Sequence, residues 1–462
     1  MLRLWLSMTK HTVILSAVKD LLLIFAAKDI LALRIKIHYN QLLMKQYFTG
    51  LWRNKDFLKL WTSETISVFG SQITNLALPL TAALMLHATP FQMGALEAMA
   101  TLPFALFSLF AGVYVDRMKR LPIIMSMECL SGVALLLVPL SMWLGILNMW
   151  VLYLAVFVCG FANVVFGVAH QTYVTSLVSR QHLVEANSKL GMSWSGAEIA
   201  GPSVAGMLVH AIGGPFAIIV DAITFFISAI VIRQIRKPEP ALAAPAQGAT
   251  VKRDIIEGLK LVYHNPVLWS LAVGVGLWQI LHHTYLALFI LFATRELHLD
   301  AGTVGLVFSM SGVGFLIGAL MVKRASARYG IGPVVLVAML MTGIAWCGVA
   351  LAQGKGAIAA IELSIAMLLF GLGAGVFTIN YISMRQVVTP DHMLGRMTAT
   401  MRFLTVASVP IGTLLGGLLG ELIGLRATLG VVGVLGVLLA SATIVMSPLR
   451  NLKKLEAPLV GA

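Results

Sequence analysis

Charge is scarce in this sequence. Only 11% of its 462 residues are Asp, Glu, Lys or Arg, whereas soluble globular proteins carry about 25%. Hydrophobic residues make up 59% of the chain and gather in long runs. This composition excludes an ordinary soluble enzyme and, for most of the length, a disordered chain. Because a membrane helix needs about 20 apolar residues, the chain has room for roughly a dozen spans.

Cysteine is also scarce, and so are the short motifs of common enzymes. Cys129, Cys159 and Cys347 lie inside apolar runs, so they offer neither metal-ligand spacing nor a disulfide framework. The sequence has no Gly-x-x-x-x-Gly-Lys loop, no His-Glu-x-x-His and no Gly-x-Ser-x-Gly. The sequence therefore offers no motif for ATP-driven transport or for intramembrane hydrolysis. We expect a protein that is not an enzyme and that needs no cofactor and no metal.

Twelve apolar segments predict an all-α membrane protein with twelve transmembrane helices in two sets of six. The first set is expected at about 61–86, 93–115, 122–144, 149–172, 190–212 and 215–233. The second set is expected at about 267–292, 302–322, 333–353, 357–382, 399–423 and 427–447.

The positions of the basic residues predict the orientation of these spans. If residues 51–60 are cytoplasmic, then among the 33 Lys and Arg residues only Arg295, Lys355 and Arg426 fall in loops on the other side, apart from those in residues 1–50. This asymmetry follows the positive-inside rule and puts both termini in the cytoplasm. It also explains the net charge of +14 without nucleic acid.

The polar interruptions predict the domain boundaries. Met44 is a second plausible start, so we interpret residues 1–43 as a non-native or dispensable extension, with a membrane-surface helix as the alternative. The expected domains are a basic extension at 1–50, a first six-helix half at 51–234, a cytoplasmic linker with an interfacial helix at 235–265, a second half at 266–448 and a cytoplasmic tail at 449–462.

The two halves repeat at an offset of about 210 residues. Residues 179–187 match 389–397, and at the same offset Gly206 meets Gly416 and Gly214 meets Gly424. Two six-helix halves related by a parallel repeat are typical of secondary transporters, which bind their substrate between the halves near the middle of the membrane.

Ionisable residues inside a membrane are costly, so each is a candidate for function. The proton-coupling candidates are Glu198, Asp221 and Glu64. Glu198 lies three residues before Gly201-Pro202 in the fifth span, where a buried acid held by hydrogen bonds is the alternative. Asp221 lies about two turns inside the sixth span. Glu64 lies near the inner end of the first span, where a structural ion pair is the alternative.

Polar and aromatic stripes predict the lining of a substrate cavity. Ser71 and Asn75 follow Glu64 on one face of the first span, and Asn163 and His170 form a polar stripe on the fourth. Trp278, His282 and Tyr285 form an aromatic stripe on the seventh span, which suits an apolar ligand or, alternatively, contact with lipid or other helices. Arg402 faces either lipid headgroups or an anionic substrate.

Four segments carry a resemblance to a known family. They are residues 57–80, which include Phe57-Leu-Lys-Leu-Trp61 and Ala77-Leu-Pro79-Leu80; Gly112-Val-Tyr-Val-Asp116-Arg117-Met-Lys119-Arg120; Gly201-Pro202 with Gly206; and Ser447-Pro448-Leu449-Arg450. Over about residues 55–455 the chain resembles major facilitator superfamily transporters. Within them it is similar to the bacterial efflux branch that includes enterobactin exporters and macrolide efflux proteins. The family usually has Gly where Lys119 stands, and many relatives have Asp where Ser71 stands.

The resemblance implies two functional elements. In the family, the loop that matches Gly112, Asp116, Arg117, Lys119 and Arg120 holds the two halves together in the outward-facing state. A Gly-Pro element in the fifth span, here Gly201-Pro202 followed by Gly206, marks exporters that exchange substrate for protons. Simple packing of small residues is the alternative for that element.

Together these features predict a monomeric, multi-pass transporter of the bacterial inner membrane. It would export a hydrophobic or amphipathic small molecule, drug-like or macrolide-like, by proton antiport and alternating access. A dedicated enterobactin-like siderophore exporter is the alternative, since a catecholate substrate favours His, Arg and aromatic residues. Uptake by symport is disfavoured by Gly201-Pro202. A non-transporting membrane sensor would share this fold.

Overall fold

A computed structural model describes residues 50–239, 251–390 and 393–446. The expectations for residues 1–49, for the tail at 449–462 and for both termini lie outside the described residues. Among the described residues, those up to Leu58 belong to one compact unit and those from Lys59 onward to another. In the first unit, the 3₁₀ turn η1 (Gly50–Arg53) is followed by Asn54, whose side-chain oxygen accepts the backbone N–H groups of Asp56 and Phe57 at 3.1 Å. This contact caps the start of the first long helix.

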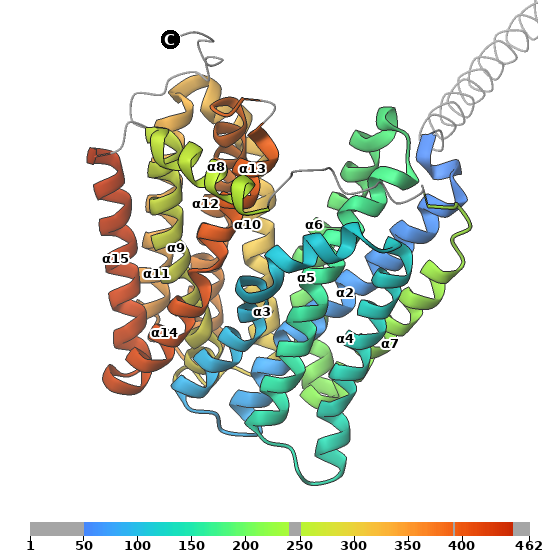
Figure 1. Ribbon diagram of the computed structural model, residues 1–462. Helices are drawn as coiled ribbons and strands as arrows, with labels where there is room; N and C mark the ends of the chain where they lie inside the picture. The colour runs from blue at the N-terminus through green and yellow to red at the C-terminus, as the bar shows by residue number, and fades with distance from the viewer. Residues whose placement is uncertain (1–49, 240–250, 391–392, 447–462) are drawn as a thin grey trace, which may run out of the picture. The chain divides into compact units, whose positions relative to one another are not determined.

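The described residues form helices and no strand (Figure 1). Before the linker lie α2 (Lys55–Leu84), α3 (Pro90–Asp116), α4 (Arg120–Trp143), α5 (Met149–Leu177), η2 (Arg180–His182), α6 (Leu183–Ile212) and α7 (Gly214–Arg233). The linker carries α8 (Val251–His264). After it lie α9 (Pro266–Leu291), the π-helical turn η3 (Phe292–Glu296), α10 (Ala301–Tyr329), α11 (Ile331–Leu351), α12 (Ala357–Val387), α13 (Leu394–Val406), α14 (Val409–Ile423) and α15 (Leu425–Met446).

Nine of the described helical segments are long and apolar enough to cross a membrane. The long helices α2, α3 and α6 are not among these nine. Two of them, α2 and α6, carry the polar residues of the site described below, which lowers their hydropathy. The count of twelve spans therefore stays a prediction.

One expected span contains a break in its helix. The span expected at 399–423 lies within Leu394–Ile423, one of the nine candidate spans, but α13 ends at Val406 and α14 begins at Val409. The break has a local cause, because Pro410 lacks an N–H group and its ring clashes with the carbonyl group four residues earlier. The hydroxyl group of Ser408 instead donates to the carbonyl oxygen of Thr405 at 2.6 Å.

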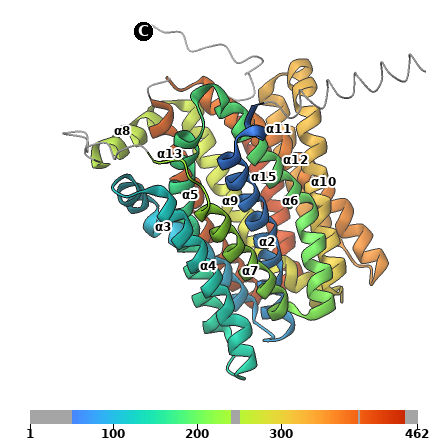
Figure 2. The ribbon, with the colours of Figure 1, turned by 90° about the vertical axis from the view of Figure 1, so that its right-hand side faces the viewer.

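We call α2–α7 the first helix group and α9–α15 the second. In the first group α4 packs against α5 and α7, and α3 packs against α5. In the second group α10 packs against α12, and α11 packs against α12 and α15. The two groups meet chiefly where α6 packs against α10 and where α3 packs against α14. Figures 1 and 2 both show α8 beside α13.

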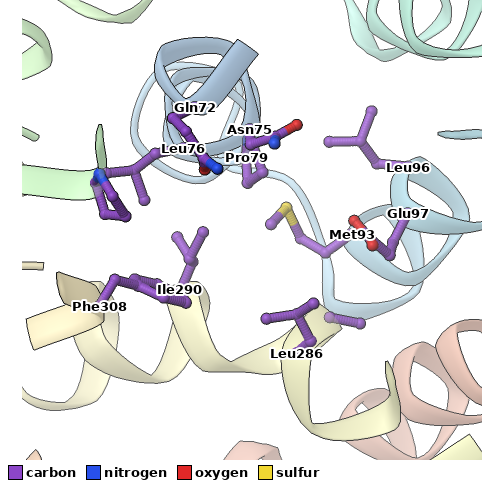
Figure 3. Close-up of a pocket in the computed structure, with 12 residues that line it drawn as sticks. Gln72, Asn75, Leu76, Pro79, Met93, Leu96, Glu97, Leu286, Ile290 and Phe308 are labelled. Atoms are coloured by element: carbon purple, nitrogen blue, oxygen red, sulfur yellow. The ribbon is translucent and has the colours of Figure 1, made fainter. Parts of the chain in front are cut away.

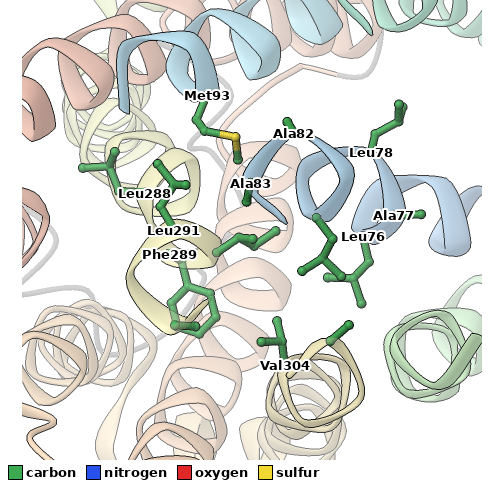
Figure 4. Close-up of a cluster of buried hydrophobic side chains, with 14 of the residues drawn as sticks. Leu76, Ala77, Leu78, Ala82, Ala83, Met93, Leu288, Phe289, Leu291 and Val304 are labelled. Atoms are coloured by element: carbon green, nitrogen blue, oxygen red, sulfur yellow. The ribbon is translucent and has the colours of Figure 1, made fainter. Parts of the chain in front are cut away.

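The helices run alternately up and down, so each group has two ends. The linker end carries α8 and the connections that follow α3, α5, α7, α10 and α12. The opposite end carries the connections that follow α2, α4, α6, α11 and α14, together with η3. At the opposite end a buried apolar cluster joins Leu76 and Ala83 of α2 to Met93 of α3, Leu288 of α9 and Val304 of α10 (Figure 4). The two helix groups thus share a core at this end.

Two pairs of glycines allow the helix groups to approach closely. A Cβ atom added at Gly206 would lie 2.8 Å from the Cα atom of Gly305, and one added at Gly94 would lie 3.0 Å from the Cα atom of Gly417. The first pair lies between α6 and α10, and the second between α3 and α14. The repeat offset of about 210 residues relates Gly94 to Gly305 and Gly206 to Gly417. The two crossings are therefore repeat-related small-residue contacts.

Candidate functional site

Three buried carboxyl groups lie inside the first helix group. Glu64 on α2, Glu128 on α4 and Asp221 on α7 are 5%, 2% and 1% exposed. Two of them, Glu64 and Asp221, are proton-coupling candidates from the sequence. Burying a charge is costly unless it has partners, so the groups that contact these acids decide what they can do.

Glu64 joins three helices. One carboxylate oxygen lies 2.9 Å from Nε2 of His170 on α5, and the other accepts the indole N–H of Trp194 on α6 at 2.8 Å. The ring of His170 also stacks on Phe166 at 5.3 Å between centroids. The structure thus brings together Glu64, which was predicted to couple protons, and His170, which was predicted to line the substrate cavity. An imidazole beside a carboxylate is a pair that can carry a proton.

Hydroxyl groups of α2 contact the other two acids. Ser67 donates to the carboxyl group of Glu128 at 3.4 Å. Thr74 donates to Asp221, which also accepts the hydroxyl group of Thr224 at 3.1 Å. Within the described part of the chain, these two acids are held by hydroxyl groups rather than by a salt bridge. Such acids are free to take up a proton without breaking an ion pair.

The largest described cavity has two of the three buried acids, Glu64 and Glu128, in its lining. It has a volume of about 410 Å³ and includes Glu64, Ser67, Ser71, Gln72, Asn75, Glu128, Asn163, Phe166, His170, Trp194, Phe225 and Arg402 in its lining. Glu64 and Trp194 lie in the first halves of their helices and His170 in the second half of its helix, which places this cavity toward the linker end. Arg402 of α13 enters the cavity with its guanidinium group 4.9 Å from the centre of the Phe104 ring.

A second cavity, of about 310 Å³, continues toward the opposite end (Figure 3). Gln72, Asn75 and Glu97 supply its polar groups, and Met93, Leu96, Leu286, Ile290 and Phe308 are among its apolar lining residues. A third cavity, of about 120 Å³, lies within the first group beside Asp221 and Asn163. Asn75 lines all three, so the predicted polar face of α2 is the common wall of the cavities.

The aromatic stripe of α9 lies elsewhere. Trp278 and His282 stack on each other at 4.8 Å and on Phe370 of α12, and Tyr285 contacts Trp346 of α11 at 6.0 Å. The indole N–H of Trp278 donates to the hydroxyl group of Thr342 at 3.1 Å. The structure therefore places Trp278, His282 and Tyr285 in the interior of the second helix group and not among the residues that line the three described cavities.

Glu198 lies apart from the other proton-coupling candidates. It is exposed, and Trp194 and Pro202, four residues to either side on α6, line the first and second cavities. Helical spacing puts Glu198 on the same face as these two residues. Its position is compatible with contact to the space between the helix groups.

The Gly201-Pro202-Gly206 element packs against two helices. A Cβ atom added at Gly201 would lie 2.5 Å from the side chain of Gln72 on α2, and one added at Gly206 would lie 2.6 Å from the carbonyl oxygen of Ala301 on α10. Ser203 and Ser309 join α6 to α10 through their hydroxyl groups at 2.6 Å. The element therefore lies at a contact between the helix groups, as packing and antiport would both require.

The predicted gating loop contacts the linker. The carboxylate of Glu239 accepts the backbone N–H groups of Arg120 at 2.7 Å and of Leu121 at 2.8 Å, where it neutralises the positive end of α4. Lys119 is the residue before α4, Arg117 is exposed, and Gly112 lies inside α3. The side chain of Asp116 lies outside the described residues. A latch between the halves stays a prediction.

Several residues of the site were missed by sequence reasoning. Gln72, Glu97 and Trp194 line the cavities, and Thr74 holds Asp221. Thr74 lies on the predicted face of α2, three residues after Ser71, and this spacing could have found it. No sequence signal distinguishes Trp194 from other aromatic residues. In the described residues no cluster of His, Cys, Asp and Glu suits a metal ion.

Comparisons with known proteins agree with this architecture. Residues 49–459 match the model of a family described as transmembrane secretion effector. The chain is 26% identical to the multidrug efflux pump Tap of Mycolicibacterium fortuitum, over 78% of this chain and 88% of that protein. It is also 26% identical to the uncharacterized MFS-type transporter YfiS of Bacillus subtilis, over 83% and 91% of the two chains.

The fold is similar to that of solved transporters. A bacterial homologue of the iron transporter ferroportin, in an inward-facing state, superposes with a TM-score of 0.68 at 17% identity, over 86% of this chain and 99% of that one. The nucleoside transporter NupG superposes with a TM-score of 0.64. The family match, the efflux relatives and the helical fold lead to one assignment: the chain belongs to the transmembrane secretion effector family of the major facilitator superfamily.

Proposed function

We propose that this transporter exports hydrophobic or amphipathic small molecules in exchange for protons. The observation that carries the proposal is the cavity of about 410 Å³ whose lining includes the buried acids Glu64 and Glu128, with Asp221 beside the adjoining third cavity. In an antiporter, binding at the proton site must change the affinity of the substrate site. This arrangement supplies both kinds of site within one helix group. Glu64, Asp221 and Glu198 are the proposed proton carriers.

The arrangement in the membrane is part of the proposal. Twelve spans in two halves, 51–234 and 266–448, cross the bacterial inner membrane, with both termini in the cytoplasm. Basic residues concentrate at the linker end, so this end faces the cytoplasm. The larger cavity then faces the cytoplasm, while the two glycine crossings close the periplasmic end. The protein works as a monomer by rocking the halves about the cavities.

The cavity lining indicates the substrate class. Phe166, Trp194 and Phe225 supply aromatic surface, and Gln72, Asn75 and Asn163 supply hydrogen-bonding groups. A few polar groups on an apolar wall are typical of sites for drug-sized molecules. The relative from Mycolicibacterium fortuitum is named a multidrug efflux pump. This name supports drug-sized molecules as the substrate class.

A second candidate substrate is an enterobactin-like siderophore. Arg402 lines the larger cavity beside Phe104 and Phe166. A guanidinium group next to aromatic rings suits an anionic catecholate. Multidrug efflux and siderophore export differ in whether Arg402 is needed.

The test uses inverted membrane vesicles that contain the protein and are acid inside. Macrolides, dyes, tetracyclines and catecholate siderophores are added in turn while lumenal pH and substrate uptake are followed. Proton antiport predicts that a substrate releases protons from the lumen, and that Glu64→Gln, Asp221→Asn or Glu198→Gln weakens this release. Glu362→Gln is the matched control, since in the described part of the chain Glu362 accepts the backbone N–H groups of Gln353 and Gly354 and lines none of the three cavities.

Each outcome decides one part of the proposal. Release with catecholates alone, lost in Arg402→Gln, would favour siderophore export. Uptake of a compound without any change of lumenal pH would contradict proton antiport and leave sodium coupling or uniport. No uptake of any compound, with folded protein present, would favour a non-transporting sensor.

A further inference from the structure

A second acid–imidazole pair links the two helix groups. Oε1 of Glu97 on α3 lies 3.8 Å from Nδ1 of His283 on α9. The side chains are 29% and 16% exposed, so both are largely shielded from water. Nδ1 of His283 is buried and donates to no hydrogen-bond acceptor in the described residues. Glu97 is therefore the group that this nitrogen faces.

The pair lies where a proton could pass between the cavities and the opposite end. Glu97 lines both the second and the third cavity, and Figure 3 shows its carboxyl group beside Met93 and across from Leu286 of α9. Glu97 is seven residues from the start of α3, or about 10 Å along the helix. The pair thus lies deeper than the loops of the opposite end and at the boundary between the helix groups.

Other described contacts between the groups are of different kinds. Ser203 and Ser309 are joined through hydroxyl groups, and Arg295 donates to the carbonyl oxygen of Ala88 at 2.8 Å. His210 and Asp300 lie 3.5 Å apart, but their side chains are 65% and 53% exposed, so water screens this contact. Of these described contacts between the helix groups, the one between Glu97 and His283 is titratable, shielded from water and remote from the loops.

Other ionisable side chains lie on the helices around this pair. They are His282 on α9 itself, whose ring lies 5.2 Å from that of His283; Tyr153 on α5; Asp221 on α7, across the third cavity; Glu198 on α6; Arg402 on α13; and Glu421 on α14, which accepts from Thr89. The parts of α2 and α10 that line the second cavity present uncharged side chains. Among the described residues, His283 is the ionisable side chain that contacts the carboxyl group of Glu97.

We propose that Glu97 and His283 together bind one proton and that this proton holds the opposite end closed. With the proton, an imidazolium ion faces a carboxylate across α3 and α9. Without it, the imidazole is neutral and the attraction is lost. The proposal rests on the proposed function, because it gives an antiporter a site that keeps the periplasmic end shut while a proton is bound. Loss of the proton to the cavity then permits opening.

The test needs no substrate, so it is separate from the vesicle experiment. Spin labels are attached to Leu144→Cys and Leu422→Cys, two exposed positions at the opposite end in different helix groups, after Cys129, Cys159 and Cys347 are replaced by Ala. Electron–electron double resonance then gives the distance distribution of purified protein at steps between about pH 4 and about pH 9, a range that covers both carboxyl and imidazole titrations.

The proposal predicts that the ratio of short to long distances falls by about fivefold as the pH rises, the lower bound of typical coupling energies. Glu97→Gln and His283→Gln should each abolish this response. Glu362→Gln, on α12 of the second group, should leave it unchanged. The exchanged pair, Glu97→His with His283→Glu, should restore it because an acid again faces an imidazole.

Results that overturn the proposal are equally definite. An unchanged ratio in the wild type, or a full response in either single variant, contradicts it. If Glu97→Gln does not fold, His283→Gln carries the same test, and a full response in it is again a contradiction. Proton-coupled transport in vesicles without this response would overturn the pair alone. The response without any transport would overturn the proposed function alone.

Discussion

The two helix groups differ in what they bury. The first group buries Glu64, Glu128 and Asp221 and contacts them with hydroxyl, imidazole and indole groups. The second group buries a stack of Trp278, His282, Trp346 and Phe370. Although the sequence repeats, the described acids beside the cavities come largely from the first group. The comparison indicates that the buried carboxyl groups beside the cavities belong to the first group, whereas the second group contributes aromatic and imidazole side chains, His283 among them.

The largest effect is expected at a contact between the groups. In Gly206→Leu the new side chain would begin 2.6 Å from the carbonyl oxygen of Ala301, so α6 and α10 could no longer approach. Because overpacking of this kind costs about 1–3 kcal/mol, we expect at least about a fivefold loss of transport. Substrate uptake into inverted vesicles measures it.

Gly191 on the same helix is the matched control, since a Cβ atom added there meets nothing within 4 Å. Gly191→Ala should keep nearly full transport. Equal losses in the two variants would contradict the role of the crossing.

The next effect separates the aromatic residues of the two groups. Trp278→Ala should lower the free energy of unfolding by about 3–5 kcal/mol, because it leaves a cavity in a packed stack. Trp194→Phe should cost only about 1 kcal/mol, the value of the hydrogen bond to Glu64 that it removes, but should weaken substrate binding. Denaturant unfolding in detergent measures the free energy of unfolding, and ligand titration measures the affinity for substrate. Reversed results would mean that α9 lines the substrate site.

A smaller effect is expected at the pair formed by Glu64 and His170. Glu64→Gln should lower the free energy of unfolding by about 1–2 kcal/mol, since the contact of 2.9 Å loses its charge. In a double-mutant cycle with His170→Gln, the loss of unfolding free energy in the double variant should differ from the sum of the two single losses by about 1 kcal/mol.

Glu185→Gln is the control for this cycle, because the contact of Glu185 with Lys189, one turn later on the same helix, is worth about 0.5 kcal/mol or less. Strict additivity of Glu64→Gln and His170→Gln would show that the two side chains do not interact.

The smallest effect concerns a loop of the second group. The hydroxyl group of Thr303 donates to Asp300 at 2.7 Å and holds the pKa of this carboxyl group below its ordinary value. The resulting stabilisation is present above the pKa of the unfolded chain and is lost as the pH falls through the folded pKa. Asp300→Asn should therefore flatten the acid limb of a plot of melting temperature against pH. An unchanged limb would contradict this.

The sequence predicted the helical class, the family and the polar face of α2, because apolar run length and spacing determine them. It also named Glu64 and His170, but periodicity within one helix cannot show that residues of α2 and α5 meet. The stripe of Trp278, His282 and Tyr285 was assigned to a cavity because an apolar core and an apolar cavity wall have the same spacing. Glu97 and His283 escaped prediction because their pairing exists only where α3 and α9 meet.

The most direct test of the account is the number of protons moved per substrate by purified protein in proteoliposomes. The wild type is compared with the triple variant Glu64→Gln, Glu128→Gln and Asp221→Asn, and with Glu362→Gln in the second group. The account predicts that the ratio of protons to substrate falls in the triple variant and stays at the wild-type value in Glu362→Gln. A triple variant that transports with the wild-type ratio would contradict the assignment of proton coupling to the first helix group.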